Sequence, residues 1–568
     1  MRAGPVLSRR IHCSAWSHSL RAQIAAPSRR LSRFSPVARP YSTRTESREA
    51  SSFWIAFLLL TVGGGAWIYN TNSYPDSPTQ LRPPPQEPFL GIIDTLQTMP
   101  TEPAPGTLGS LTSEQEVKLQ EFWVLALKVF GVKLDGLELD QARGSGKGDA
   151  PPPSPKKSAP KSRWSIWGRS TEEEEDTKSV SSASGIASSL ASINITDGDD
   201  KYGQSKEFQQ ALVDLSPEEI RTAFWSMVKQ DHPDSLVLRF LRARKWDVKK
   251  ALIMFISTMR WRLQDMHVDD DIMANAESLA VKQSQSSQPA EKKKGEEFLT
   301  QLRMGKSFLH GVDRFGRPIC VVRVRLHRAS EQTPETLERY TVYTIETARL
   351  LLAPPVETAT IIFDMTDFSL ANMDYTPVKF MIKCFEANYP ESLGSVLIHK
   401  APWVFSSIWG IIKGWLDPVV AAKIHFTKNR DDLEKFIPRN QIMKELEGDE
   451  DWEYKYVEVR PGENDKMEDT ETRDTLIRQR QDLAQEVQDS TIEWIRTSFK
   501  GQTEAAKAAK EKRNAQIEQL RKQYWELDPY IRARSLYDRL DIIKGQGKIE
   551  FYPGAEKTDS KDTAGAAQ

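Results

Sequence analysis

The chain has 568 residues, of which 39% are hydrophobic and 28% are charged, and its formal net charge at pH 7 is -1. A chain of this length exceeds what one core usually organises, so we expect several units joined by linkers. The near-neutral charge, without a basic stripe interleaved with aromatic residues, argues against nucleic acid binding. The three cysteines, Cys13, Cys320 and Cys384, lack metal or redox spacing, which argues against a disulfide framework or a cysteine-based zinc site.

The first 45 residues are basic and contain no acid. Nine arginines recur there among serine and alanine residues, with no Asp, Glu or Lys. This composition is typical of a mitochondrial transit peptide. The stretch Arg39-Pro40-Tyr41-Ser42 resembles a matrix-peptidase site with cleavage after Tyr41. We therefore predict a targeting segment of the mitochondrial type over 1–45, the alternative being a disordered basic tail.

Residues 51–70 form an uncharged apolar segment with aromatic residues near both ends. Its length just crosses a hydrocarbon core of about 30 Å, and Trp54 and Trp67 suit the two interfaces. The Gly63–Gly65 run disfavours the alternative, a buried soluble helix. We predict a single transmembrane helix in the mitochondrial inner membrane, with the C-terminal part in the intermembrane space. Translation from Met99 is an alternative, and it would give a cytosolic or peripheral membrane protein.

Residues 71–140 are predicted to be a linker followed by a short amphipathic helix. Thr112 precedes a periodic apolar stripe that ends near Val132, which is the pattern of a capped helix. Residues 141–206 combine a Pro/Lys segment, an acidic run and a Ser-rich tract. Because this composition buries little apolar surface, we predict a disordered linker there.

From residue 208 the pattern becomes that of a folded domain. A capping box over Ser216–Glu219 opens a set of helices within 208–265, and we predict a polar insertion over 266–297. Within 298–460, short β-branched runs alternate with helical stretches. The predicted strands are Ile319–Val324, Thr360–Phe363 and Val396–Ile398, and the predicted helices are Pro334–Leu352 and Tyr375–Asn388. This alternation predicts an α/β domain with a mostly parallel sheet.

Six segments of this domain follow one another in the order of a known family's motifs. They are Leu236–Asp247, His310–Pro318, Phe363–Thr366, Asn388–Gly394, Lys400–Trp403 and Trp415–Ile424. On these motifs the chain resembles the CRAL-TRIO (Sec14-like) lipid-binding family, of the fungal phosphatidylinositol transfer protein type. The resemblance implies an α/β fold with an N-terminal helical subdomain and a phospholipid cavity covered by an apolar gate helix.

The gate element would be Val404–Leu416, which is apolar on nearly every side. A helix of this kind is either buried or lies against lipid, so a central core helix is the alternative interpretation. The resemblance implies instead a gate over the lipid cavity that opens when the protein docks on a bilayer. The expected gate and cavity residues are Phe405, Ile408, Trp409, Ile412 and Trp415.

Three positions match the family's inositol-lipid site, namely Arg244, Glu391 and Lys423. The resemblance implies that the two cations face phosphate, while Glu391 pairs with Lys423 and the inositol hydroxyls. The alternatives are a solvated helix face for Arg244 and an ordinary ion pair for the other two. Val420 stands where several relatives have a threonine that contacts the phosphate, and Ala371 replaces one of two hydroxyls that relatives use for phosphatidylcholine. The resemblance therefore favours phosphatidylinositol over a choline lipid.

The sequence lacks the motifs of common enzyme classes. It has no nucleophile elbow, Walker A loop, dinucleotide fingerprint or His-Glu-x-x-His pair. The histidines of the domain have no ligand spacing; they are His310, His327, His399 and His425. We therefore expect no catalytic residue, no metal and no cofactor.

After residue 460 the chain turns polar and helical. We predict a helical tail over 461–545, with apolar stripes at Ile492–Phe499 and Ile517–Tyr524, and disorder over 546–568. The Ala/Lys/Glu-rich middle of the tail argues against a sustained coiled coil, and we expect the tail to pack along the lipid-binding domain. The predicted function is binding and transfer or presentation of a phospholipid, with phosphatidylinositol as the expected lipid. The alternative is a membrane-tethered scaffold that binds a protein partner through its C-terminal helices.

Overall fold

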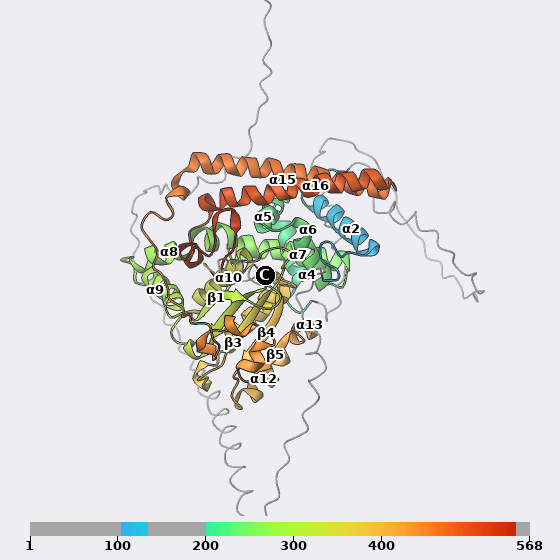
Figure 1. Ribbon diagram of the computed structural model, residues 1–568. Coiled ribbons are helices and arrows are strands. Elements are labelled where there is room, and N and C mark those ends of the chain that lie inside the picture. Colours follow the sequence, from blue (N-terminus) through green and yellow to red (C-terminus); the bar gives the residue numbers. More distant parts are fainter. Residues whose placement is uncertain (1–103, 135–199, 553–568) are drawn as a thin grey trace, which may run out of the picture. The chain divides into compact units, whose positions relative to one another are not determined.

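The structure is a computed structural model that describes residues 104–134 and 200–552 (Figure 1). The predicted targeting segment 1–45 and transmembrane helix 51–70 lie outside the described residues, as does the predicted linker 141–206 up to residue 199. Those assignments stay predictions. None of the helices in the described part of the chain is both long enough and apolar enough to span a bilayer.

A bundle of helices forms the N-terminal part of the described chain. Its members are α2 (Ser113–Val129), α4 (Gln204–Asp214), α5 (Pro217–Val228), α6 (Pro233–Ala243) and α7 (Val248–Arg260). Thr112 and Ser216 begin α2 and α5 with capping boxes, in which each hydroxyl accepts a hydrogen bond from the backbone N–H three residues later. Aromatic rings fill the core, where Phe224 and Phe255 meet edge to face with centroids 5.5 Å apart.

A five-stranded sheet follows in the order β1-β2-β3-β4-β5. The strands are β1 (Ser307–Val312), β2 (Pro318–Arg323), β3 (Ala359–Asp364), β4 (Leu393–His399) and β5 (Ile424–Thr427). β1 and β2 pair antiparallel, and every later neighbour pairs parallel. The predicted mostly parallel sheet is therefore confirmed, and the three predicted strands correspond to β2, β3 and β4.

Helices connect the strands and cover the sheet. The longer helices are α10 (Pro334–Leu350), α11 (Tyr375–Lys383) and α12 (Phe405–Lys413). The shorter helices are η10 (Cys384–Asn388), α13 (Pro418–Ala421) and α14 (Arg430–Glu434). Short turns complete the domain: η6 (Trp261–Asp265), η8 (Val324–Leu326), η9 (Leu370–Asn372), η11 (Arg439–Gln441) and η12 (Lys444–Leu446). Each parallel pair is thus joined by a crossover that contains a helix.

The segment 266–297, predicted as a polar insertion, is helical. It contains η7 (Val268–Met273) and α8 (Ala274–Ser284) and runs into α9 (Pro289–Arg303). A few apolar anchors such as Ile272 are buried, although most of the segment is polar. The absent side chain of Gly295 lets α9 approach α8 closely, since a Cβ there would lie only 2.4 Å from the Ala280 carbonyl oxygen.

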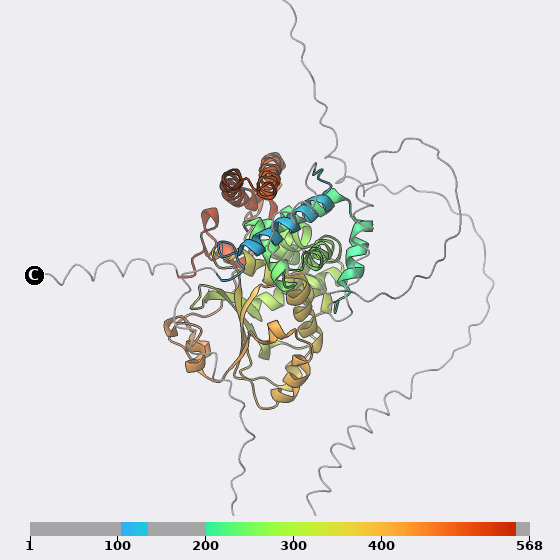
Figure 2. The same cartoon turned by 90° about the vertical axis from the view of Figure 1, so that its right-hand side faces the viewer.

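Two long helices form an antiparallel hairpin over the N-terminal bundle. They are α15 (Thr470–Phe499) and α16 (Thr503–Ile531), which run side by side at the top of Figure 1 and are seen nearly end-on in Figure 2. Their apolar stripes point inward, because Ile495, Leu520 and Tyr524 are all buried. The expected packing of the tail on the rest of the chain is therefore present.

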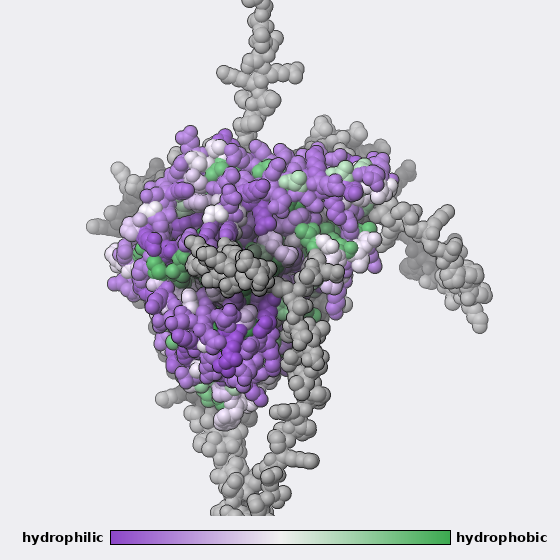
Figure 3. All heavy atoms as spheres, viewed as in Figure 1, coloured by the Kyte–Doolittle hydropathy of each residue, from purple (hydrophilic) through white to green (hydrophobic). Residues whose placement is uncertain are grey.

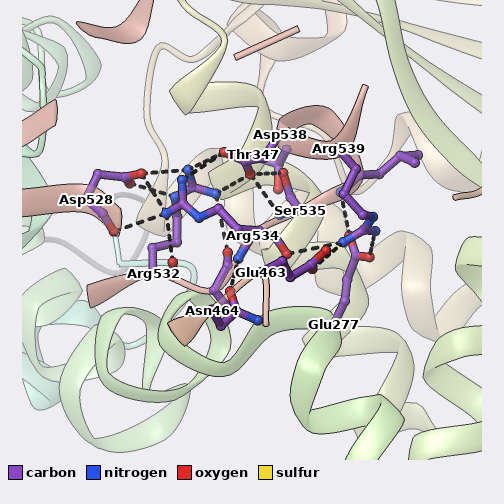
Figure 4. Close-up of polar contacts among 12 residues, drawn as sticks. Glu277, Thr347, Glu463, Asn464, Asp528, Arg532, Arg534, Ser535, Asp538 and Arg539 are labelled. Atoms are coloured by element: carbon purple, nitrogen blue, oxygen red, sulfur yellow. Dashed lines mark hydrogen bonds and ion pairs between the residues drawn. The ribbon is translucent and has the colours of Figure 1, made fainter. Parts of the chain in front are cut away.

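The chain after the hairpin is fixed by a buried network of charges (Figure 4). Arg532 and Arg534 both bind the carboxylates of Asp528 and Asp538. The fully buried carboxylate of Glu277 accepts hydrogen bonds from the Leu536 backbone N–H, at 2.9 Å, and from Arg539. Further short elements are η13 (Asp465–Glu468), α17 (Leu536–Arg539) and η14 (Gly545–Gly547).

The predicted disorder over 546–568 is wrong for residues 546–552. Ile549 pairs with Ile543 in an antiparallel bridge, and Phe551 packs against the core on one face of the sheet. These apolar side chains give a short segment enough buried surface to be ordered.

Candidate functional site

The central strands present alternate side chains to the two faces of the sheet, as the pleat of a strand requires. One face contributes Cys320, Val322, Ile361, Phe363, Val396 and Ile398 to the wall of a cavity. The residues between them, Val321, Ile362 and Leu397, are buried in a separate core on the opposite face. The same three strands therefore build a packed core on one side and a hollow on the other.

The cavity has a volume of about 250 Å³. Helices complete its wall, with Ile345 on α10, Met381 on α11 and Trp409 on α12. The wall is mostly apolar, so it suits an acyl chain better than a polar metabolite. In the described part of the chain, no cluster of three or more His, Cys, Asp or Glu side chains could hold a metal ion.

Helix α12 forms one side of the cavity. Phe405, Trp409 and Ile412 line it, and their spacing places them on one face of the helix. Of the other two predicted gate residues, Ile408 is buried in the adjacent core without lining the cavity. Trp415 lies beyond the end of α12 and meets Tyr375 edge to face, with centroids 5.3 Å apart.

The outer side of α12 is exposed, so the alternative of a central core helix is wrong. Ile411 on this helix is 49% exposed, and Trp403 just before it is 88% exposed. Val419 and Phe426 are also exposed nearby in the chain. Apolar surface is visible at the lower end of the view in Figure 3, the end at which Figure 1 places α12. Large contiguous apolar surfaces of proteins are often interaction sites, so this end of the domain is a candidate for one.

The three predicted headgroup residues lie outside the cavity wall. Lys423 Nζ is 3.2 Å from Glu391 Oε2, so the expected pair is formed. The pair lies at the starts of β5 and β4, next to Ile424 and Leu393, which line the cavity. Arg244 ends α6, where its guanidinium donates a hydrogen bond to Gln204 Oε1.

The strands, cavity and helical bundle correspond to a known architecture. The chain matches the family model for the CRAL/TRIO domain over residues 302–448 and that for the CRAL/TRIO N-terminal domain over residues 204–257. A CRAL-TRIO domain-containing protein of Schizosaccharomyces pombe is 41% identical over 437 residues, covering 77% of this chain and 92% of the relative. The chain belongs to the CRAL-TRIO lipid-binding family.

Two further relatives of this CRAL-TRIO protein carry informative names. The phosphatidylinositol transfer protein CSR1 of Eremothecium gossypii is 38% identical over 450 residues, covering 78% of this chain and 99% of the relative. The Sec14 cytosolic factor of Schizosaccharomyces pombe is 27% identical over 264 residues, covering 43% of this chain and 84% of the relative. The similarity to the first of these extends well beyond the matched CRAL/TRIO domains.

Polar contacts connect the end of the segment Val404–Leu416 to the residues just before α4 in this CRAL-TRIO protein. The sequence analysis did not reveal them. Glu386 on η10 accepts hydrogen bonds from Lys201 Nζ, Tyr202 Oη and the Asp417 backbone N–H, each at 2.7 Å. Lys201 also donates to the Trp415 carbonyl oxygen. We call these residues the Glu386 latch. Lys201 and Tyr202 belong to the predicted disordered linker, which therefore ends earlier than expected.

A second polar cluster, also missed by sequence reasoning, lies in the cavity wall. Lys306 Nζ donates to Gln332 Oε1 at 2.9 Å and lies 3.4 Å from His327 Nδ1. On its other side, His327 Nε2 is 3.4 Å from Asp374 Oδ2, and Asn372 Nδ2 donates to the His327 carbonyl oxygen at 3.0 Å. We call this cluster the inner polar corner. Burial lowers the pKa of Lys306 to about 8, and burial also lowers the pKa of His327.

Proposed function

We propose that this CRAL-TRIO protein binds phosphatidylinositol and transfers it between membranes or presents it at one. The apolar cavity with α12 as one wall is the observation that carries the proposal. Burial of acyl chains, at about 25 cal/mol per Å² of apolar surface, would supply most of the binding free energy. The Eremothecium gossypii relative is named a phosphatidylinositol transfer protein, and this supports the choice of lipid. The protein would act as a carrier and would catalyse no reaction.

In this proposal α12 is the gate. The cavity of about 250 Å³ lies just below the range of about 300–1,000 Å³ typical of small-molecule pockets. A phospholipid with two acyl chains therefore needs the cavity to open. A Cβ at Gly410 would have no neighbour within 4 Å among the described residues, so the outer side of the helix is open at this position. The exposed Trp403 and Ile411 would enter the bilayer as the gate opens.

The proposed headgroup site is the Glu391–Lys423 pair together with Arg244. With the acyl chains in the cavity, the headgroup would stay at the starts of β4 and β5. Lys423 is partly buried, and among the described residues its ion-pair partner is Glu391, so exchanging Glu391 for a lipid phosphate preserves a charge-assisted contact. Val420 lines the cavity, and its side chain has no hydroxyl to donate to that phosphate. Selectivity would thus depend on Arg244, Glu391 and Lys423.

The test is lipid capture and transfer by the purified chain. We expect mass spectrometry to find phosphatidylinositol bound to protein from cells, and we expect transfer of labelled phosphatidylinositol between vesicles. Trp403→Ala should weaken vesicle binding by about tenfold or more, because full burial of a large apolar side chain contributes about 1.5–3 kcal/mol. Val213→Ala is the matched control, since Val213 on α4 is 80% exposed but lies outside this surface. A lipid-free protein without transfer activity would refute the proposal.

Membrane tethering is part of the same proposal. The segment 51–70 would anchor the protein in the mitochondrial inner membrane after import directed by residues 1–45, and the domain would then exchange lipids locally. The support is the composition of these segments. The N-terminal residue of the mature protein tests it: Ser42 would support import, whereas Met99 would refute it. As for the scaffold alternative, none of the exposed large hydrophobic side chains in the described part of the chain lies on α15 or α16, so no observation favours it.

A further inference from the structure

Lys306 is a buried cation in the wall of an apolar cavity. The residue is only 5% exposed, and its ammonium group contacts two groups without negative charge, Gln332 Oε1 and His327 Nδ1. No carboxylate of residues 104–134 or 200–552 forms an ion pair with it. An ammonium group has three N–H donors, and these contacts use two of them. The remaining donor has no partner within the described protein.

The other cation in the cavity wall, Arg323, has a counter-ion. Arg323 binds the carboxylate of Glu445 through two nitrogens, at 2.7 and 2.5 Å. Within the cluster, His327 lies between Lys306 and the carboxylate of Asp374, and the carboxylate of Glu331 attracts Lys306 through space without forming an ion pair with it. A buried ammonium without a counter-ion is unfavourable, and the lowered pKa of Lys306 reflects that cost. An anionic ligand beside Lys306 would remove this free-energy cost.

The inner polar corner is far from the proposed headgroup residues. Lys306 adjoins Ser307, whose partner Val322 is near the carboxyl end of β2. Glu391 and Lys423 instead precede β4 and β5, at the amino ends of the parallel strands. A strand of six residues spans about 20 Å, so one compact headgroup does not reach both ends. The inner polar corner and the Glu391–Lys423 pair are therefore two separate polar sites, of which only the first contributes to the cavity wall.

We propose that the inner polar corner is a second headgroup site for a lipid with a single anionic oxygen group, either a carboxylate or a phosphate monoester. Lys306 would supply the charge and a hydrogen bond through its remaining donor. The lipid chain would lie along the apolar wall. The same ammonium would repel the quaternary ammonium of a choline lipid. This inference rests on the proposed function, since it requires that the cavity holds a lipid.

The test uses three ligands with the same oleoyl-length chain: oleate, oleoyl lysophosphatidate and neutral oleyl alcohol. Binding to the delipidated full chain is measured by titration calorimetry. We expect at least one of the two anions to bind about tenfold or more tightly than oleyl alcohol. This is the difference in affinity expected for one hydrogen bond to a charged group. Tighter binding of oleate would assign a carboxylate, and tighter binding of the lysophosphatidate would assign a phosphate. Equal affinity of the alcohol and both anions would overturn the inference.

Variants separate this site from the cavity itself. Lys306→Met should remove the preference for anions and keep the affinity for oleyl alcohol, while Lys306→Arg should retain the preference. Gln332→Glu supplies Lys306 with an internal carboxylate, so it should abolish the preference without removing the lysine, even if Lys306→Met fails to fold. Lys444→Met, at an exposed surface pair, is the control. A preference for anions that survives in Lys306→Met and Gln332→Glu would overturn the inference. If the unaltered chain binds none of the three ligands, the proposed function is refuted.

Discussion

The C-terminal hairpin is locked to the N-terminal bundle by a buried ion pair. Arg513 on α16 donates two hydrogen bonds to the carboxylate of Asp234 on α6, at 2.6 and 2.7 Å. Arg513 also donates to Thr491 Oγ1 on α15 at 2.6 Å, and Trp123 Nε1 on α2 donates to Asp234 at 2.7 Å. Four helices therefore meet at one charge pair. The perturbation that tests this junction is Arg513→Met, which removes the cation and leaves a buried carboxylate.

The expected loss of stability is large. Removing one partner of a buried pair typically costs about 3–5 kcal/mol, because the other charge is left uncompensated. Burial alone would raise the pKa of Asp234, but the charge of Arg513 and the hydrogen bonds lower it from 3.8 to about 2. At about 1.4 kcal/mol per pH unit, that depression corresponds to about 2 kcal/mol of stability. Since the folded-state pKa is depressed, this contribution is complete above pH 4 and is lost as the pH falls from 3.8 towards 2.

The assay is urea unfolding of the full chain, followed by tryptophan fluorescence and circular dichroism. A double variant, Arg513→Met with Asp234→Leu, is the control, because an apolar pair can replace a buried ion pair at little cost. We expect it to be more stable than Arg513→Met alone and to lose the acid-dependent part of the unfolding curve. A loss below about 1 kcal/mol in Arg513→Met, the level of a surface pair, would refute the argument that the hairpin is locked by this contact.

Two further predictions concern the cavity and the latch. Leu397→Ala on the packed face of β4 should cost about 2–5 kcal/mol in urea unfolding. Its neighbour Ile398→Ala should cost less because Ile398 borders the cavity, and it should instead lower the amount of co-purifying lipid; equal losses of stability would contradict the two-faced sheet. Glu386→Ala should raise the rate of lipid exchange between vesicles by about two- to tenfold, since each lost hydrogen bond contributes about 0.5–1.5 kcal/mol to closure. Glu207→Ala, which loses a partly buried pair with Arg260 away from η10, is the control, and an unchanged rate in Glu386→Ala would argue against the latch.

The three central strands β2, β3 and β4 could be predicted from the sequence, whereas the buried strand β1 and the partly exposed strand β5 could not. Ile361 borders the cavity while its neighbour Ile362 is packed in the opposite core, so the whole run is apolar and is recognised locally. β5 has only four residues, and its Phe426 is exposed. Its pairing with β4 depends on contacts with a strand far away in the chain. No local pattern marks such an edge strand.

The two polar clusters could not be predicted because each joins residues that are distant in sequence. Lys201 and Glu386 are 185 positions apart, and Lys306 meets Gln332 across 26 positions. The Glu391–Lys423 pair could be predicted only from the family resemblance. A lysine in a polar stretch is ordinarily a solvated side chain. Only the fold shows that the ammonium group of Lys306 is directed into a buried corner rather than into water.

The sequence of α12 does not by itself show which of its apolar side chains face the cavity. An ordinary surface helix has one apolar and one polar face, which identifies the buried side. On α12 the inward Trp409 and the outward Ile411 are both large and apolar, although one lines a cavity and the other is half exposed. An apolar side chain that faces water gains no burial there, so a second apolar environment would give it a favourable contact. The gate proposed above supplies that environment, because a helix that covers a lipid cavity and docks on a bilayer meets lipid on both sides.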